Sequence, residues 1–188
     1  KPDVLFTEFT NIEALNSSGY EKTIHRFKFS KSQKPIVAQI WGTNLDNYFK
    51  SAQLIERLDF DGIDINMGCP DREVIKTGGG AALIKNYSLV KEIIKATRKG
   101  AKKIPLSIKT RLGFDKVITD EWISFLLEQK IDALSIHLRT AKQKSRGLAN
   151  WDELKKIIEL KNKISPNTII IGNGDIKSFQ QVIDKHKK

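Results

Sequence analysis

Residues 64–70 read Asp64-Ile65-Asn66-Met67-Gly68-Cys69-Pro70. They close a run from Gly62 to Met67 whose composition is typical of a buried β-strand. Gly68 allows another backbone segment to approach closely, and Pro70 ends the strand because it has no N–H to donate. Cys69 is the only cysteine among the 188 residues. Its position at the end of a buried strand favours a chemical role for the thiol over a structural one.

Further strands and helices are indicated on both sides of this run. Five more segments have the composition of strands, at residues 4–9, 36–41, 106–110, 133–137 and 168–171. Helical periodicity separates them, as at Leu45, Phe49, Ala52, Ile55 and Leu58. Two capping-box patterns, Asn150-x-x-Glu153 and Ser178-x-x-Gln181, indicate helix starts. Strands that alternate with helices in this way predict βα units in a parallel sheet.

Two architectures use such units, the doubly wound open sheet and the eight-stranded barrel. The only glycine cluster, Gly78-Gly79-Gly80, follows a loop and fits neither a dinucleotide fingerprint nor a P-loop. We therefore expect an α/β fold of the TIM-type (β/α)8 barrel class. With about six βα units, and a length below the roughly 250 residues typical of such barrels, residues 1–188 are expected to form an incomplete barrel with two exposed strand edges.

Composition limits the other classes of function. The formal net charge of +11 indicates either a partner such as RNA or a general lysine bias of the proteome, since most of the basic residues are Lys. A single cysteine excludes an intramolecular disulfide and a CxxC-type zinc site. No apolar run approaches the roughly 20 residues that span a bilayer. We expect a cytoplasmic, monomeric protein without a metal or a membrane segment.

Unusual polar residues occur late in five successive strands. They are Gln39, then Asn66 and Cys69, then Lys109 and Arg111, then His137 and Arg139, and finally Asn173 with Asp175. Each has an ordinary explanation when taken alone, such as turn chemistry for Asn173-Gly174-Asp175 or a solvated surface charge for an arginine. In a βα barrel, however, the carboxyl ends of the strands meet at one rim, where substrates and cofactors bind. The set predicts a single site.

Three of these residues suggest the chemistry. Lys109 lies in an apolar strand and needs an anionic partner, which is either Asp64, Asp175 or a negatively charged ligand. His137 is either a hydrogen-bonded core histidine or a ligand contact. An unperturbed thiol has a pKa of about 8.5, so Cys69 can act as a proton donor or as a nucleophile.

The motifs resemble those of the tRNA-dihydrouridine synthases, which are flavin-dependent barrel enzymes. The matching blocks occur in the order of that family and cover most of the chain. They are Ala38-Gln39-Ile40-Trp41-Gly42, Asp64 to Pro70, Gly78-Gly79-Gly80-Ala81-Ala82-Leu83, Ile108-Lys109-Thr110-Arg111-Leu112-Gly113, His137-Leu138-Arg139-Thr140 and Asn173-Gly174-Asp175-Ile176. The Asn-x-Gly-Cys-Pro block is the most specific of them.

The resemblance implies reduction of the C5=C6 bond of uridines in tRNA by FMN, with NADPH as reductant. Cys69 would protonate C5 from the face opposite the hydride. The implied flavin contacts are Gln39, Lys109, His137, Asn173, Gly174 and Asp175. Asn66 and Arg139 would hold the uridine, and no metal is involved.

Two departures and two alternatives accompany the resemblance. Leu138 replaces the glycine that the family usually has between His and Arg. The family's first strand with its flavin loop, its last strand and its C-terminal helical tRNA-binding domain have no counterpart in residues 1–188. One alternative is another FMN barrel, of the dihydroorotate dehydrogenase or enoate reductase type. The other is a noncatalytic RNA-binding remnant, which should have lost Cys69, Lys109 or Gln39.

Overall fold

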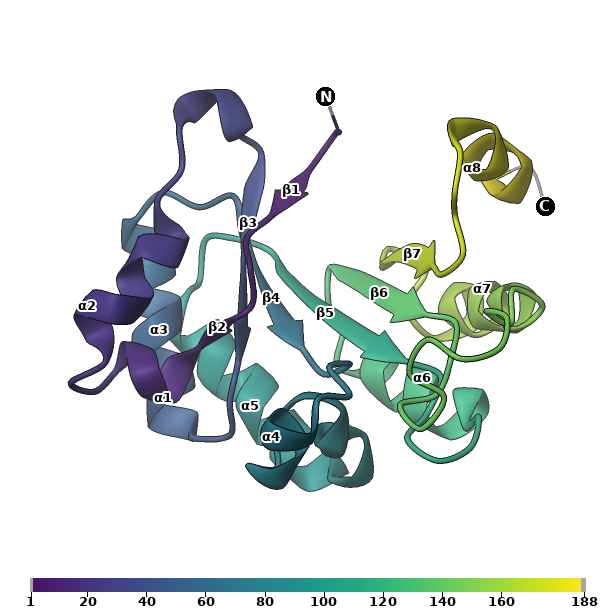
Figure 1. The fold of residues 1–188 in the computed structure, drawn as a ribbon, viewed down its shortest axis with the longest axis horizontal. Coiled ribbons are helices and arrows are strands. Elements are labelled where there is room, and N and C mark those ends of the chain that lie inside the picture. The colour runs from purple at the N-terminus through teal and green to yellow at the C-terminus, as the bar shows by residue number, and fades with distance from the viewer. Residues whose placement is uncertain (1, 187–188) are drawn as a thin grey trace.

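The computed structural model describes residues 2–186, which contain one seven-stranded parallel sheet. The order is β1-β3-β4-β5-β6-β7, and β2 pairs with the end of β3. The strands are β1 (Leu5–Phe6), β2 (Thr10–Asn11), β3 (Ile36–Trp41), β4 (Gly62–Asn66), β5 (Leu106–Arg111), β6 (Ala133–His137) and β7 (Ile169–Asn173). Because sequential strands are neighbours and the sheet curls, the chain forms a half-barrel (Figure 1). This confirms the predicted incomplete barrel and excludes the doubly wound order.

Helices follow most strands and cover one face of the sheet (Figure 1). They are α1 (Ile12–Leu15), α2 (Tyr20–Thr23), α3 (Leu45–Arg57), α4 (Arg72–Lys76), α5 (Tyr87–Gly100), α6 (Thr119–Glu128), α7 (Glu153–Ile164) and α8 (Phe179–His186), with 3-10 turns at Ile24–Phe27, Lys31–Gln33 and Gly80–Lys85. Within the described part of the chain, none of these helices combines the length and apolar character that crossing a membrane requires.

The two faces of the sheet differ in chemistry because side chains alternate along each strand. Ile63, Ile65, Ile108, Leu134 and Ile136 are buried in the hydrophobic core. The alternate positions form layers across the opposite, concave face. One layer joins Gln39, Asp64 and Ser107, the next joins Asn66, Lys109 and Ser135, and the third joins Arg111, His137 and Asn173. The fold therefore gathers polar groups on the face that the helices leave open.

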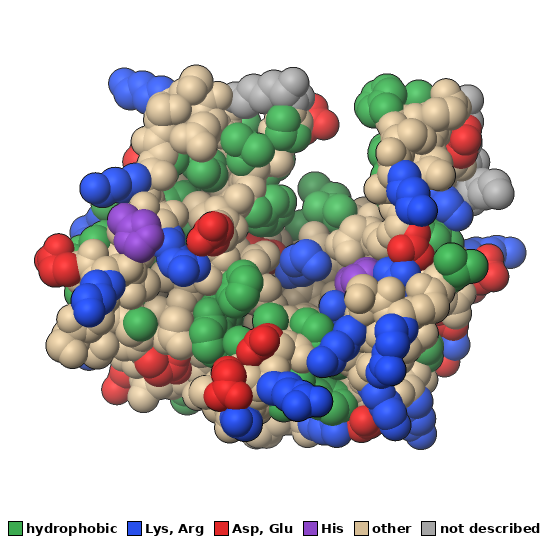
Figure 2. Space-filling view, in the orientation of Figure 1, with side chains coloured by type: hydrophobic (Ala, Val, Ile, Leu, Met, Phe, Trp, Pro, Cys, Tyr) green, Lys and Arg blue, Asp and Glu red, His purple; other side chains and the backbone are tan. Residues whose placement is uncertain are grey.

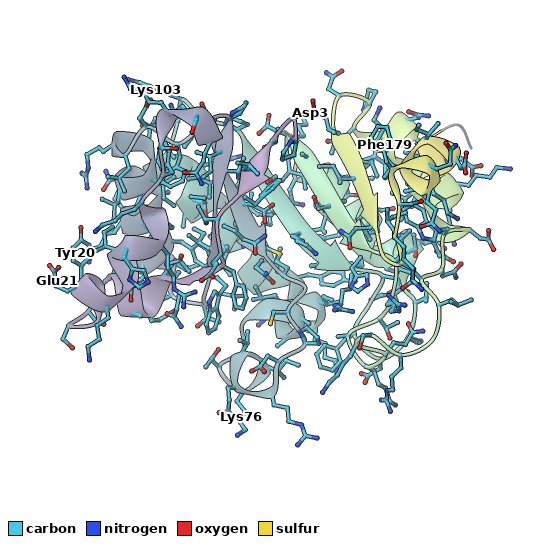
Figure 3. The ribbon with its side chains drawn as sticks, turned by 45° about the horizontal axis from the view of Figure 1, so that its top comes forward. Asp3, Tyr20, Glu21, Lys76, Lys103 and Phe179 are labelled. Atoms are coloured by element: carbon cyan, nitrogen blue, oxygen red, sulfur yellow. The ribbon has the colours of Figure 1, made fainter. Side chains whose placement is uncertain are left out.

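The sheet has two edges, β1 and β7, and both carry exposed apolar side chains. Phe6 on β1 is 42% exposed and Ile169 on β7 is 62% exposed. Asp3, just before β1, and Phe179, at the start of α8, lie at the same end of the molecule on either side of the opening (Figure 3). A deep notch separates these two regions in the space-filling view (Figure 2).

Some local predictions differ from the structure. The strand expected at 4–9 is shorter than predicted, since β1 ends at Phe6 and the Thr7 hydroxyl accepts the Gln39 N–H in place of a ladder carbonyl. The next strand, β2, begins only at Thr10, outside the predicted range. The box at Asn150 is wrong, since α7 begins at Glu153 after Asp152 and has no side-chain cap. At the second box, Ser178 accepts from the Gln181 N–H as expected, but the Gln181 side-chain oxygen accepts from the Lys177 N–H.

Candidate active site

The loop after β4 places Cys69 at the rim of the concave face. The Asn66 side-chain oxygen accepts hydrogen bonds from the N–H groups of Gly68 and Cys69, at 3.1 and 2.9 Å. A side chain at Gly68 would come within 3.3 Å of the Thr110 backbone, so the close approach predicted from this glycine is present. The Cys69 thiol remains partly exposed. The loop thus presents a sulfur on a rigid turn.

Gly80 supports this loop from the other side. It has φ +56°, its neighbour Ala81 donates its N–H to the Cys69 carbonyl, and an added Cβ would lie 2.8 Å from that carbonyl and 2.7 Å from Val74. Gly147, with φ +70°, has no atom within 4 Å of an added Cβ. It therefore provides a control for the backbone strain alone.

Gly80→Ala is expected to destabilise the protein by about 3 kcal/mol, because backbone strain of about 1 kcal/mol adds to the clash. Gly147→Ala should lose stability only through the backbone strain. Urea unfolding of both variants measures the difference. Equal losses would show that the space around Gly80 relaxes without cost.

A chain of hydrogen bonds lies beneath the Cys69 loop. The Asp64 carboxylate accepts from Ser107 Oγ at 2.6 Å and from Gln39 Nε2 at 2.7 Å. Gln39 Oε1 in turn accepts from Asn66 Nδ2 at 3.0 Å. Asp64 is 0% exposed. Burial raises its pKa to about 6, although the Ser107 and Gln39 hydrogen bonds and the charge of Lys109 oppose that rise.

Lys109 lies on β5 next to this chain. It interacts electrostatically with Asp64 and Cys69, yet it takes part in none of the ion pairs found among residues 2–186. Burial is the main cause that lowers the pKa of its ammonium, and Arg111 adds to it. Asp175, the other partner considered for Lys109, pairs with Arg139 instead. The ammonium therefore keeps its donors available to a ligand.

Arg111 bridges two loops and is 8% exposed. Its guanidinium donates to the Gly68 carbonyl at 2.7 Å, and to the carbonyls of Thr140 and Lys144 at 3.2 and 3.0 Å. The sequence pattern predicted that Arg111 lies at a strand end but indicated no role for it. It did not indicate Ser107 as a site residue. Alternation with Lys109 on one strand was the available signal for Arg111. The buried Asp64 was considered only as a partner of Lys109.

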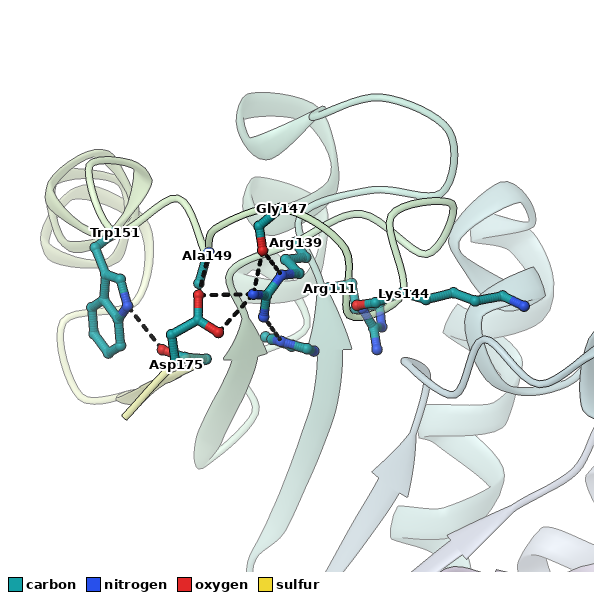
Figure 4. A network of polar contacts seen from close by, with 9 residues as sticks. Arg111, Arg139, Lys144, Gly147, Ala149, Trp151 and Asp175 are labelled. Carbon is teal, nitrogen blue, oxygen red and sulfur yellow. Dashed lines mark hydrogen bonds and ion pairs between the residues drawn. The ribbon is translucent and has the colours of Figure 1, made fainter. Parts of the chain in front are cut away.

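Arg139 is held in a network at the end of β6 (Figure 4). Its guanidinium donates to both Asp175 oxygens, at 2.6 and 2.8 Å, and to the Gly147 carbonyl at 2.6 Å. The ion pair lowers the pKa of Asp175, which also accepts from the Ala149 N–H. Arg139 thus braces the loop of residues 140–148, and most of its N–H groups are occupied.

His137 completes this network as a neutral ring. Its Nε2 lies 3.1 Å from Arg139 Nη1, and because arginine only donates, Nε2 accepts and the ring proton resides on Nδ1. Burial, together with the charges of Arg111, Lys109 and Arg139, lowers its pKa to about 4. Gly174 allows the close packing, since an added Cβ would lie 3.2 Å from the His137 ring. Asn173 pairs with His137 in the sheet.

The pKa shift of His137 predicts a pH dependence of stability. Its folded pKa, about 4, is below the ordinary 6.5, so the unfolded chain binds the proton more strongly. Stability is therefore lost as the pH falls from 6.5 towards 4. Asp64, raised to about 6, acts in the opposite direction over the same range. His137→Gln should remove the contribution of His137 and leave that of Asp64. The unfolding free energy of the variant minus that of wild type should therefore rise as the pH falls. A difference that does not change with pH would contradict this.

The structure thus brings together the strand-end residues predicted to form one site. They come from β3, β4, β5, β6 and β7 and lie on the concave face or its rim. Hydrogen bonds join Gln39 to Asn66, and a second network joins His137, Arg139 and Asp175. Lys109 shares a layer with Asn66, next to the layer that contains His137. Among the described residues, no group of three or more His, Cys, Asp or Glu side chains has an arrangement that suits a metal ion.

Parallel βα units with a polar site at the carboxyl ends of their strands define the class, a βα-barrel domain whose candidate site is on its rim. Within that class, the chain belongs to the dihydrouridine synthase (Dus) family, whose model matches residues 3–188.

Curated relatives agree with this assignment. The chain is 41% identical over 178 residues to a probable tRNA-dihydrouridine synthase of Staphylococcus aureus strain COL, covering 94% of this chain and 54% of the relative. It is 40% identical over 182 residues to probable tRNA-dihydrouridine synthase 2 of Bacillus subtilis strain 168, covering 96% and 55%. The chain therefore spans about half the length of these relatives.

A solved structure shares the fold. Orotidine 5'-monophosphate decarboxylase from Methanocaldococcus jannaschii superposes with a TM-score of 0.50 at 14% identity, covering 98% of this chain and 83% of that chain. At this level of identity, the likeness concerns the fold alone.

Proposed function

We propose that this chain supplies the catalytic barrel residues of a tRNA-dihydrouridine synthase, which reduces the C5=C6 bond of tRNA uridines with FMN and NADPH. The observation that carries the proposal is the partly exposed Cys69 at the rim, electrostatically coupled to Lys109 and Arg111. Membership of the dihydrouridine synthase family supports the reaction. The names of the curated relatives support tRNA as its substrate.

The residues on the concave face fit the pyrimidine edge of a flavin, which is rich in hydrogen-bond acceptors. Gln39, Lys109 and the Nδ1–H of His137 are donors, and Gln39 Oε1 retains a lone pair for a ring N–H. Asn173, Gly174 and Asp175 would line the remainder of the cofactor site. Reduced FMN would supply the hydride for C6 of the uracil ring. The positive charge of Lys109 stabilises negative charge that develops beside it.

Cys69 would donate the proton to C5. The Lys109 ammonium and the Arg111 guanidinium interact favourably with the thiolate that remains after the transfer. Asn66 holds the backbone of the loop, so the sulfur is positioned before the substrate arrives. Asn66 and the remaining N–H of Arg139 are the proposed uridine contacts.

The surface next to the site suits RNA. Lys142, Lys144 and Arg146 are exposed on the loop that Arg111 and Arg139 brace, and Leu148 beside them is 85% exposed. Figure 2 shows Lys and Arg side chains gathered over this region. Phosphate contacts there would offset the few kcal/mol needed to extrude a uridine from a folded tRNA.

Nucleoside mass spectrometry tests the function. Unmodified tRNA is incubated with the 188-residue chain, FMN and NADPH, and in parallel with a chimera in which these residues replace the matching segment of the Staphylococcus aureus relative. We expect dihydrouridine in the tRNA, and no turnover of dihydroorotate or a small enoate. Unchanged uridine in both arms despite bound flavin would reject the proposal, and turnover of a small substrate alone would assign another flavin reaction.

A further inference from the structure

The hydrogen-bond chain through Gln39 and Asn66 has a defined direction. At one end, the ionised Asp64 carboxylate can only accept, so the Gln39 side chain must turn its NH2 group towards it. At the other end, the N–H groups of Gly68 and Cys69 can only donate, so Asn66 must turn its carbonyl oxygen towards them. The link between the two amides, from Asn66 Nδ2 to Gln39 Oε1, agrees with both constraints.

This direction determines what the two amides can offer to a ligand. An amide NH2 carries two protons, and in the described part of the chain each of these groups uses only one of them. One N–H of Gln39 and one N–H of Asn66 therefore remain. Both side chains are almost completely buried at the concave face, beside the Lys109 ammonium in the next strand. The ligand in contact with them must present acceptors.

We propose that Asp64 is a positioning residue that orients the Gln39 and Asn66 amides, so that Gln39 presents an N–H group to the flavin and Asn66 presents one to the uridine. The inference rests on the proposed flavin site and identifies the Asp64 carboxylate as the group that orients its amide donors. Ser107 supports the carboxylate from the opposite side through its hydroxyl group. Burial disfavours the charge of Asp64 and raises its pKa, and the Ser107 and Gln39 hydrogen bonds oppose that effect.

Four variants of the 188-residue chain separate orientation from packing. Asp64→Asn keeps a carbonyl acceptor for Gln39, because its NH2 can donate to Ser107 Oγ. Asp64→Leu removes the acceptor and keeps the same branched shape, although leucine is somewhat larger. The double variant Asp64→Asn with Gln39→Glu keeps every hydrogen bond but reverses the one between positions 64 and 39. The carboxylate introduced at position 39 accepts from the amides at positions 64 and 66. It has no N–H to offer a ligand. Gln39→Glu alone places two carboxylates together and is the reference for the double variant.

FMN affinity, from quenching of FMN fluorescence, and unfolding free energy, from urea titration, are the two readouts. We expect Asp64→Asn to bind FMN within about threefold of wild type, and Asp64→Leu to bind it about tenfold or more weakly, the value of one hydrogen bond. The double variant should recover the stability lost in Gln39→Glu, yet bind FMN as weakly as Asp64→Leu.

The outcomes are distinct. A stable double variant with wild-type affinity would overturn the proposal, as would an Asp64→Asn variant as weak as Asp64→Leu, because charge rather than orientation would then be responsible. A double variant no more stable than Gln39→Glu would show that the chain of hydrogen bonds does not form. If wild type itself binds no FMN, the flavin site proposed above fails, while the stability comparison still decides whether the chain is ordered as inferred.

Discussion

Replacing Cys69 by Ala is expected to lower the rate of dihydrouridine formation by about 10²–10⁴-fold, the usual contribution of a positioned general acid. The backbone of the loop should not change, because Asn66 holds the Cys69 N–H rather than its side chain. FMN affinity and unfolding free energy should therefore remain close to wild type. The measurement is the single-turnover rate on unmodified tRNA, with the chimera described above.

Cys69→Ser serves as the matched control for this prediction. A serine hydroxyl has nearly the size of the thiol but is a far weaker acid, so its rate should be much closer to that of Cys69→Ala than to that of wild type. A Cys69→Ala variant that retains the wild-type rate would show that the proton comes from another group.

Lys109→Met should weaken FMN binding and slow reduction of the substrate, while raising stability. The side chain is partly buried and the pKa of its ammonium is lowered, so the folded state disfavours the charge even with Asp64 nearby. Met fills a similar volume without that cost. Loss of a charge next to the flavin should reduce affinity by about tenfold or more. Flavin titration and urea unfolding measure the two opposite effects.

Lys76→Met is the control, since Lys76 is exposed and forms its ion pair with Glu73 on the same helix. Its loss should change both quantities little. If Lys109→Met were destabilised and bound FMN normally, Lys109 would be a structural partner of Asp64, which is one of the alternatives that the sequence left open.

Much of the fold could be predicted because the signals are local. The strands at 36–41 and 133–137 have the predicted bounds, and the others differ by one or two residues, except that the strand expected at 4–9 is reduced to Leu5–Phe6. The early end of that strand depends on the Thr7 hydroxyl, which accepts the N–H of Gln39, 32 positions away along the chain. The cap at Asn150 failed for a similar reason, because its segment is held by a long-range contact, the Asn150 N–H donating to the Leu138 carbonyl.

The candidate site divides in the same way. Residue type and position at strand ends selected Cys69, Lys109 and His137, since parallel strands in a barrel bring their ends together. The partners of those residues required coordinates. Asp175 binds Arg139 and not Lys109, and Arg111 joins the Cys69 loop to the loop after β6.

The sequence by itself determined the order of βα units, the family motifs and the set of polar residues at the rim. These depend on periodicity and on residue chemistry, which are properties of short segments. Only the tertiary structure decided how the donors and acceptors pair, which carboxylate is buried, and which N–H groups remain for a ligand. Those outcomes depend on distances of about 3 Å between side chains on different strands, and such distances exist only once the strands are aligned in register.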